Sequence, residues 1–135
     1  LTQPKSVLIL GHFKYPDFQK TIKKLDLSLK KDLAEARLMV ETIDADVSQM
    51  VYNIVKAGKI PIIIGGGHNN AYGNIKGTSL ALNKPINTIN FDAHTDFRTL
   101  EGRHSGNGFS YAMKDAFLKN YFVFSFLGLS VASYE

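Results

Sequence analysis

Four short apolar stretches of the chain predict β-strands. Residues 6–10 and 59–64 are continuous apolar runs that end at glycine, a pattern typical of buried parallel strands. Residues 85–91 and 121–127 are the third and fourth predicted strands, and the acidic segment 92–96 follows the third directly. All four runs are short enough to be strands of one sheet.

The clearest predicted helix spans residues 44–57. Asp44 or Asp46 can cap its start, and Gly58 can end it. Its apolar stripe has the spacing of one helix face and consists of Val47, Met50, Val51, Ile54 and Val55.

Three other segments have weaker helical signals. A helix is predicted over residues 70–82, although Gly73 and Gly77 weaken the pattern, and a short one over residues 109–118. Residues 33–40 show helical spacing inside a polar, lysine-rich stretch whose boundaries the pattern does not define.

The alternation of strands and helices predicts an α/β fold with an open parallel sheet and right-handed crossovers. A length of 135 residues fits one domain, residues 1–135, and the sequence contains no repeat or linker. Ligands of such sheets bind beyond the carboxyl ends of the strands. Residues 65–70 and 92–96 both fall at that edge and are therefore the candidate functional segments.

Composition excludes several classes of protein. The net charge of +4 comes largely from lysines in one polar stretch without interleaved aromatic residues, which favours a solvated face over a nucleic-acid site. No apolar run approaches the ~18 residues of a membrane span, so no membrane partner is expected. Cysteine is absent, which excludes disulfides and thiolate chemistry and fits a reducing compartment. We expect a cytoplasmic protein without a signal peptide, and the missing initiator Met suggests processing, a tag or a longer parent chain.

Asp92, His94 and Asp96 are candidate metal ligands. Their spacing of i, i+2 and i+4 places three side chains on one face of an extended segment. Two carboxylates and an imidazole that converge repel one another unless a cation lies between them, and this mixed set suits Mn²⁺, Fe²⁺ or Zn²⁺. The alternative is a solvated loop in which acidic residues happen to alternate.

His68 is a fourth candidate ligand because it follows a glycine run at the end of a neighbouring predicted strand. One alternative is that this histidine caps the helix that follows. Another is that the glycine run binds phosphate, but Asn70 stands where the dinucleotide fingerprint needs its third glycine, and no Gly-Lys-Ser/Thr follows.

Two segments resemble signature motifs of a known family. Gly65-Gly66-Gly67-His68 and residues 90–96 (Asn-Phe-Asp-Ala-His-Thr-Asp) are similar to the first two motifs of the arginase, agmatinase and formimidoylglutamase (ureohydrolase) family. The resemblance covers roughly residues 44–121. It implies a three-layer α/β fold with an open, central parallel sheet, of which this chain holds the N-terminal half.

The resemblance also implies a pair of Mn²⁺ ions at the carboxyl edge of the strands. By matching position, His68 and Asp96 would bind one ion, His94 would bind the other, and Asp92 would bridge them. Such a pair holds a shared water and lowers its pKa, so that the water attacks the carbon of a linear amidine without a serine or cysteine nucleophile.

The loop after the second motif carries the expectations about substrate. Arg98 stands where arginases have an asparagine that contacts the substrate, and its guanidinium can bind a carboxylate through two hydrogen bonds. This favours hydrolysis of N-formimino-glutamate to glutamate and formamide over arginase- or agmatinase-type release of urea. Ser105 and Asn107 match the substrate loop of arginases. Phe109 replaces their proton-shuttling histidine, and His104 is a candidate substitute or simply a solvated loop residue.

The family's third motif, Ser-x-Asp-x-Asp followed by Asp-Pro, has no counterpart here, since no aspartate follows Asp115. We therefore expect these 135 residues alone to hold at most one metal ion weakly and to have negligible activity. The expected partner of the active protein is a small amidine or guanidino substrate. The alternative is an inactive fragment that self-associates as a homo-oligomer or docks to a partner through an exposed sheet edge and the apolar residues 121–129.

Overall fold

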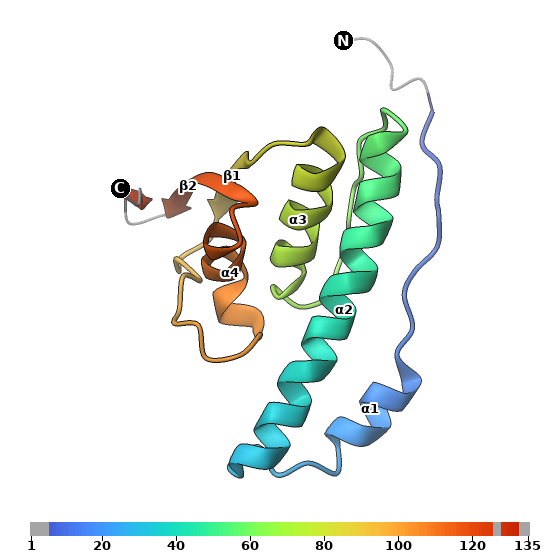
Figure 1. The fold of residues 1–135 in the computed structure, drawn as a ribbon, viewed down its shortest axis with the longest axis vertical. Coiled ribbons are helices and arrows are strands. Elements are labelled where there is room, and N and C mark those ends of the chain that lie inside the picture. The colour runs from blue at the N-terminus through green and yellow to red at the C-terminus, as the bar shows by residue number, and fades with distance from the viewer. Residues whose placement is uncertain (1–5, 126–127, 133–135) are drawn as a thin grey trace.

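The computed structural model describes residues 6–125 and 128–132. Helices and strands follow one another as in Figure 1. In chain order they are α1 (Pro16–Ile22), α2 (Lys30–Lys56), α3 (Asn70–Leu82), β1 (Ile86–Phe91), the 3₁₀-helix η1 (Ser105–Asn107), α4 (Gly108–Lys114), β2 (Leu118–Ser125) and β3 (Gly128–Ala132).

Helix α2 contains the predicted helix 44–57 except for Ala57, which caps its C-terminus, and begins fourteen residues earlier, at Lys30. Neither glycine nor proline occurs between its ends, so nothing in the sequence interrupts the helical hydrogen bonding. The predicted end is confirmed, because Gly58 adopts φ +70° and donates its N–H to the carbonyl of Val55. The predicted cap is wrong: Asp44 lies in the middle of the helix and is buried.

Helix α3 matches the predicted range 70–82 and lies beside α2 (Figure 1). The two glycines that weaken its helical pattern face α2. A Cβ added at Gly77 would lie 2.4 Å from the backbone oxygen of Ser48, and one at Gly73 would lie 2.8 Å from Cγ1 of Val47. These glycines therefore lower the helix propensity of α3 but allow the two helices to approach closely.

The described sheet has the order β1-β2-β3. Strands β1 and β2 are parallel, as predicted, and place Ile89 opposite Phe122. Strand β2 starts at Leu118 rather than at residue 121, because α4 ends at Lys114, four residues before the predicted end at residue 118. Strand β3 pairs antiparallel to β2 and was not predicted; residues 126–127 of the predicted fourth strand lie outside the described residues.

The hydrophobic core lies where α3 and α4 pack against β2. Its buried members are Tyr72, Ile75, Phe109, Ala112, Leu118, Tyr121 and Val123. Tyr121 and Val123 are fully buried, so the prediction that residues 121–129 form an exposed docking surface is wrong for these two residues, whereas Phe124 is exposed. The fold is α/β, with a parallel strand pair covered on one face by helices.

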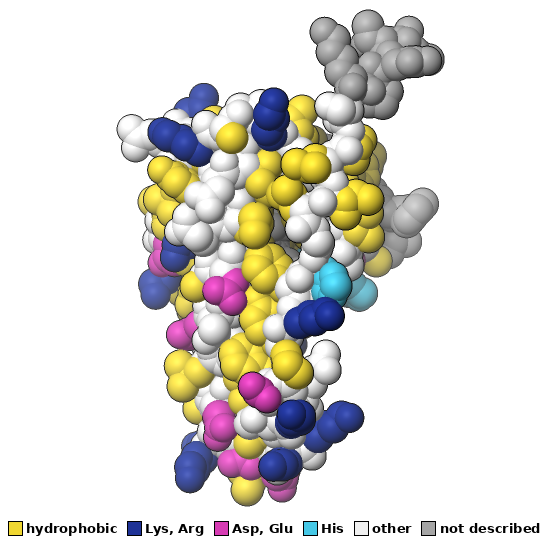
Figure 2. Space-filling model, turned by 90° about the vertical axis from the view of Figure 1, so that its right-hand side faces the viewer, with side chains coloured by type: hydrophobic (Ala, Val, Ile, Leu, Met, Phe, Trp, Pro, Cys, Tyr) yellow, Lys and Arg dark blue, Asp and Glu magenta, His cyan; other side chains and the backbone are white. Residues whose placement is uncertain are grey.

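The two predicted strands at residues 6–10 and 59–64 are not strands in the structure. Both segments are extended and solvent-exposed; Ile9 and Ile64, for example, are about nine-tenths exposed. An apolar run becomes a buried strand only where neighbouring strands complete its hydrogen bonds, and among the described residues β1 pairs with β2 alone. Figure 2 shows hydrophobic side chains exposed along the side of the molecule on which the N-terminal segment runs past α2.

Candidate metal centre

The acidic segment begins where β1 ends. The N–H of Asp92 donates to the carbonyl of Phe124, which extends the pairing with β2 by one residue. The carboxylate of Asp92 then accepts a hydrogen bond from the N–H of His94 at 2.9 Å. This hydrogen bond lowers the pKa of Asp92. This side-chain hydrogen bond turns the chain, and Asp96 adopts φ +45°. The segment is therefore a turn and not the extended run that the alternating spacing suggested.

His68 reaches this turn from the other side. Gly65 and Gly66 both have positive φ, a conformation that glycine adopts without strain, and they lead the chain from the exposed segment 59–64 to the start of α3. Nδ1 of His68 lies 3.7 Å from Oδ2 of Asp92 and is in closer contact with the carboxylate of Asp96. Its side chain makes no cap to α3, so the capping alternative is not what the structure shows.

Three of the four predicted metal ligands thus come together. One possible ligand atom each from His68, Asp92 and Asp96 lies within 4.8 Å of the others, and all three side chains are partly buried. Two carboxylates at this separation repel each other unless positive charge lies between them. The group accordingly has the composition and spacing of a site for one divalent cation.

His94 is not part of this group. Its side chain is 83% exposed, and its Nδ1 lies 3.3 Å from Oδ1 of Asp92, whereas the contact of His68 is with Oδ2. The turn explains this position, because a two-residue spacing keeps side chains on one face only in an extended chain. Whether His94 is a metal ligand stays a prediction.

An aromatic layer that the sequence reasoning did not identify supports the group. The rings of Phe109 and His68 are perpendicular, with centroids 5.6 Å apart, and Phe109 stacks on Tyr121 at 4.2 Å. The hydroxyl of Tyr121 donates to the carbonyl of Thr95 at 2.7 Å and accepts from Nδ2 of Asn90 at 3.0 Å. Burial raises the pKa of Tyr121 to about 12, so this hydroxyl is protonated at neutral pH.

The predicted substrate residues lie on the loop that follows. Arg98 and Ser105 are exposed, and the N–H of Arg98 donates to the carbonyl of Gly106. Asn107 is fully buried: its amide accepts from Nη1 of Arg103 and from the N–H of His104 and donates to two loop carbonyls. These hydrogen bonds stabilise the loop around Asn107, and a contact between Asn107 and substrate stays a prediction.

His104, the candidate proton donor, caps η1. Its Nδ1 accepts from the N–H of Gly106, so the proton of the neutral ring is on Nε2, which lies 3.2 Å from Oε1 of Glu101. Burial lowers the pKa of His104 below its ordinary value, against the opposing effect of Glu101. Both nitrogens are therefore engaged within the loop, and a role in proton transfer is a prediction that the structure does not test.

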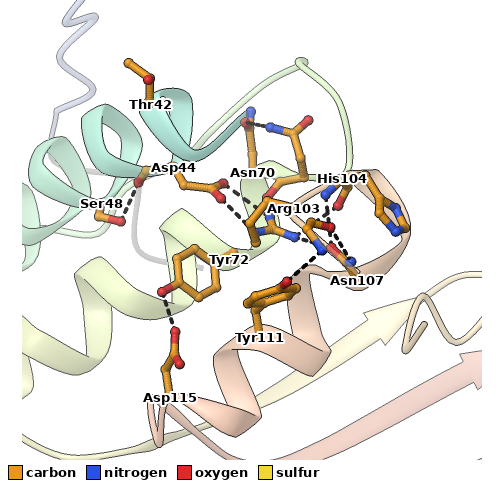
Figure 3. A network of polar contacts seen from close by, with 12 residues as sticks. Thr42, Asp44, Ser48, Asn70, Tyr72, Arg103, His104, Asn107, Tyr111 and Asp115 are labelled. Carbon is orange, nitrogen blue, oxygen red and sulfur yellow. Dashed lines mark hydrogen bonds and ion pairs between the residues drawn. The ribbon is translucent and has the colours of Figure 1, made fainter. Parts of the chain in front are cut away.

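A buried ion pair, also absent from the sequence reasoning, joins this loop to the helices (Figure 3). Arg103 is 3% exposed and binds Asp44 of α2 through Nε at 2.7 Å and Nη2 at 3.3 Å. Its remaining donors reach the carbonyls of Asn69 and His104 and the amide of Asn107. The sequence contains one signal for this pair: Asp44 lies three residues before Val47, on the buried face of the helix.

Comparisons with known proteins agree with the motifs. A model of the arginase family matches residues 7–132. A formimidoylglutamase of Chromobacterium violaceum is 39% identical over 87 residues, which are 64% of this chain and 28% of that protein. One of Streptococcus gordonii is 34% identical over 100 residues, covering 71% of this chain and 30% of that protein.

The chain spans less than a third of the length of these curated relatives. No solved structure is significantly similar to it. Within the described residues, every helix is too short or too polar to cross a membrane.

Proposed function

The chain belongs to the arginase family, and on that premise we propose that it carries part of the metal centre of a hydrolase that cleaves C–N bonds of linear amidines. The observation that carries the proposal is the group of His68, Asp92 and Asp96, whose ligand atoms lie within 4.8 Å of one another at the carboxyl end of β1.

The donor set fits one divalent cation. Two carboxylate oxygens and one imidazole nitrogen suit Mn²⁺, Fe²⁺ or Zn²⁺, and we propose Mn²⁺ as the resident ion. A second Mn²⁺ would need His94, which is exposed here, and further oxygen ligands. We propose that these further oxygen ligands come from the two aspartates of the family's third motif, which lies in a part of the domain that this sequence does not contain.

When bound, the metal pair supplies a Lewis acid and a water of lowered pKa, which the resonance-stabilised amidine carbon requires. The chain's own residues would bind and orient. The carboxylates of Asp92 and Asp96 and the ring of His68 would hold the cation, and the exposed guanidinium of Arg98 would bind a substrate carboxylate with two hydrogen bonds. His104 is the proposed donor of the proton that the leaving nitrogen takes up.

The proposed substrate is N-formimino-glutamate, cleaved to glutamate and formamide. Arg98 supports a dicarboxylic substrate, and the relatives described above carry the name formimidoylglutamase. Release of urea from a guanidino substrate is the second candidate, and Ser105 at the loop surface, which matches arginases, is the feature that favours it. The exposed apolar segments 6–10 and 59–64 favour a third, an inactive fragment that self-associates or docks to a partner.

Products distinguish these candidates. The protein encoded by the complete reading frame around these residues is assayed with Mn²⁺ on N-formimino-L-glutamate, arginine and agmatine. We expect formamide and glutamate from the first and no urea from the others. Urea without formamide would reverse the two enzymatic candidates, and no product from a metal-loaded protein would favour the inactive fragment.

Arg98 provides the matched test of substrate choice. In the complete protein, Arg98→Asn should raise KM for N-formimino-L-glutamate roughly tenfold or more, as expected when a charge-assisted pair worth about 1.5–3 kcal/mol is lost. The control for loss of charge alone is Arg37→Gln. Arg37 is a partly buried arginine of α2 that pairs with Glu101, a residue of the loop that carries Arg98. Equal KM values for the Arg98 variant and the unaltered protein would remove the reason for preferring a dicarboxylic substrate.

A further inference from the structure

Tyr121 occupies an unusual place beneath the metal-centre group. It is 0% exposed in the middle of β2, yet its hydroxyl has two polar partners, the carbonyl of Thr95 and the side-chain amide of Asn90. These partners lie on either side of Asp92 in sequence. One hydroxyl therefore connects the end of β1 to the turn that follows it.

The Thr95 carbonyl has a direct bearing on Asp96. It belongs to the peptide bond that leads into Asp96, a residue with φ +45° in the left-handed region that is uncommon for residues other than glycine. A hydrogen bond to that peptide at 2.7 Å limits the rotation of the backbone just before the carboxylate. Without it, the Thr95 carbonyl would lose this partner and the turn would be free to relax to a less strained conformation.

Tyr121 also supports the opposite side of the group. Its ring stacks on Phe109 at 4.2 Å between centroids, and Phe109 in turn lies perpendicular to the His68 ring. Tyr121 is thus connected to the histidine ligand through one intermediate side chain, while its hydroxyl bonds to the turn that carries the aspartates.

We infer that Tyr121 is a positioning residue for the metal centre, whose hydroxyl fixes the turn from Asp92 to Asp96 in the conformation that brings both carboxylates to His68. The inference rests on the proposed function for the identity of the metal ligands. The hydrogen bonds of this hydroxyl go to Thr95 and Asn90 and to none of the three ligand side chains, so it would act through the Thr95 carbonyl and the backbone of Asp96.

The test uses two tyrosine-to-phenylalanine variants of this chain. Tyr121→Phe removes the hydroxyl and keeps the ring against Phe109. Tyr72→Phe is the matched control, because Tyr72 belongs to the same core cluster and its buried hydroxyl donates to Asp115, outside the acidic turn. Urea unfolding of both variants measures the general loss of stability that any missing buried hydrogen bond causes.

Two readouts separate positioning from stability. In the metal-free chain, amide exchange of His94, whose N–H bonds to Asp92, should become several-fold faster in Tyr121→Phe than in Tyr72→Phe. In a titration with Mn²⁺ followed by electron paramagnetic resonance, affinity should fall about tenfold or more in Tyr121→Phe and less than about twofold in Tyr72→Phe.

The outcomes distinguish the inference from the proposed function. If neither the unaltered chain nor its variants bind Mn²⁺, the metal assignment is overturned, while the exchange of His94 still decides whether Tyr121 holds the turn. If the amide hydrogen of His94 exchanges at the same rate in all three proteins, Tyr121 is an ordinary core residue and the inference is wrong. The same holds if both variants change this exchange rate and the Mn²⁺ affinity to the same extent.

Discussion

Nε of Arg103 lies 2.7 Å from Oδ2 of Asp44, although the two residues are 59 positions apart in sequence. The pair joins the middle of α2 to the loop that carries the predicted substrate residues (Figure 3). Every N–H of the guanidinium has an acceptor, from Asp44, Asn69, His104 or Asn107. The loop and the start of α3 are therefore held by one buried cation.

Removing either partner of this pair should leave a buried, uncompensated charge. We expect Arg103→Met or Asp44→Leu alone to lower the free energy of unfolding by about 3–5 kcal/mol, as measured by urea titration. The double variant should recover a substantial part of that loss, because both charges leave together. Lys20→Met, which breaks the exposed pair between Lys20 and Asp17, is the control and should have no measurable effect. Single-variant losses no larger than that of the control would contradict the buried pair.

The close contact between α2 and α3 predicts an unusual response to an otherwise helix-favouring substitution. Gly77→Ala would place a methyl group 2.4 Å from the Ser48 backbone oxygen, which cannot move without displacing α2. We expect the variant to lose about 1–3 kcal/mol of unfolding free energy, although alanine has the higher helix propensity. Leu82→Ala, at a half-exposed position of the same helix, should cost less. A stabilised Gly77→Ala protein would show that the helices are not packed this closely.

His104 should make stability depend on pH. Burial lowers its pKa in the folded protein below the ordinary value of about 6.5 that applies in the unfolded chain. The folded state therefore favours the neutral ring. The contribution of His104 to the free energy of unfolding is complete above pH 6.5, and it is lost as pH falls through the lower folded-state pKa. The unfolding free energy of the unaltered chain should thus decline between pH 7.5 and 5 more steeply than that of His104→Gln. Parallel curves for the two proteins would show that the ring is not perturbed.

Local periodicity accounts for what the sequence predicts well. The range of α3 and the end of α2 follow from helical spacing and from Gly58, and strand β1 follows from the apolar residues before Asp92. These features depend on neighbours within a few positions. The motif residues were also identifiable, because His68 follows a glycine run and the aspartates follow the apolar run that forms β1.

Features that depend on distant partners were not predictable in this way. The segments 6–10 and 59–64 have the composition of buried strands, but no described strand pairs with them, and their side chains are exposed. The departure of His94 from the group results from the hydrogen bond between its N–H and Asp92, which residue spacing alone does not show. The position of Asp44 on an apolar helix face signals a buried partner, but nothing in a single sequence identifies that partner as Arg103.

The most direct test of the account is a calorimetric titration of the 135-residue chain with Mn²⁺, beside the variants His68→Ala, Asp96→Asn and His94→Ala. We expect one ion, held weakly by the three-residue group, since water completes its shell without offsetting charge. Binding should be lost in His68→Ala and Asp96→Asn and changed little in His94→Ala, whose side chain lies outside the group. Two sites of micromolar or tighter affinity, or binding that survives both His68→Ala and Asp96→Asn, would contradict the proposed metal centre.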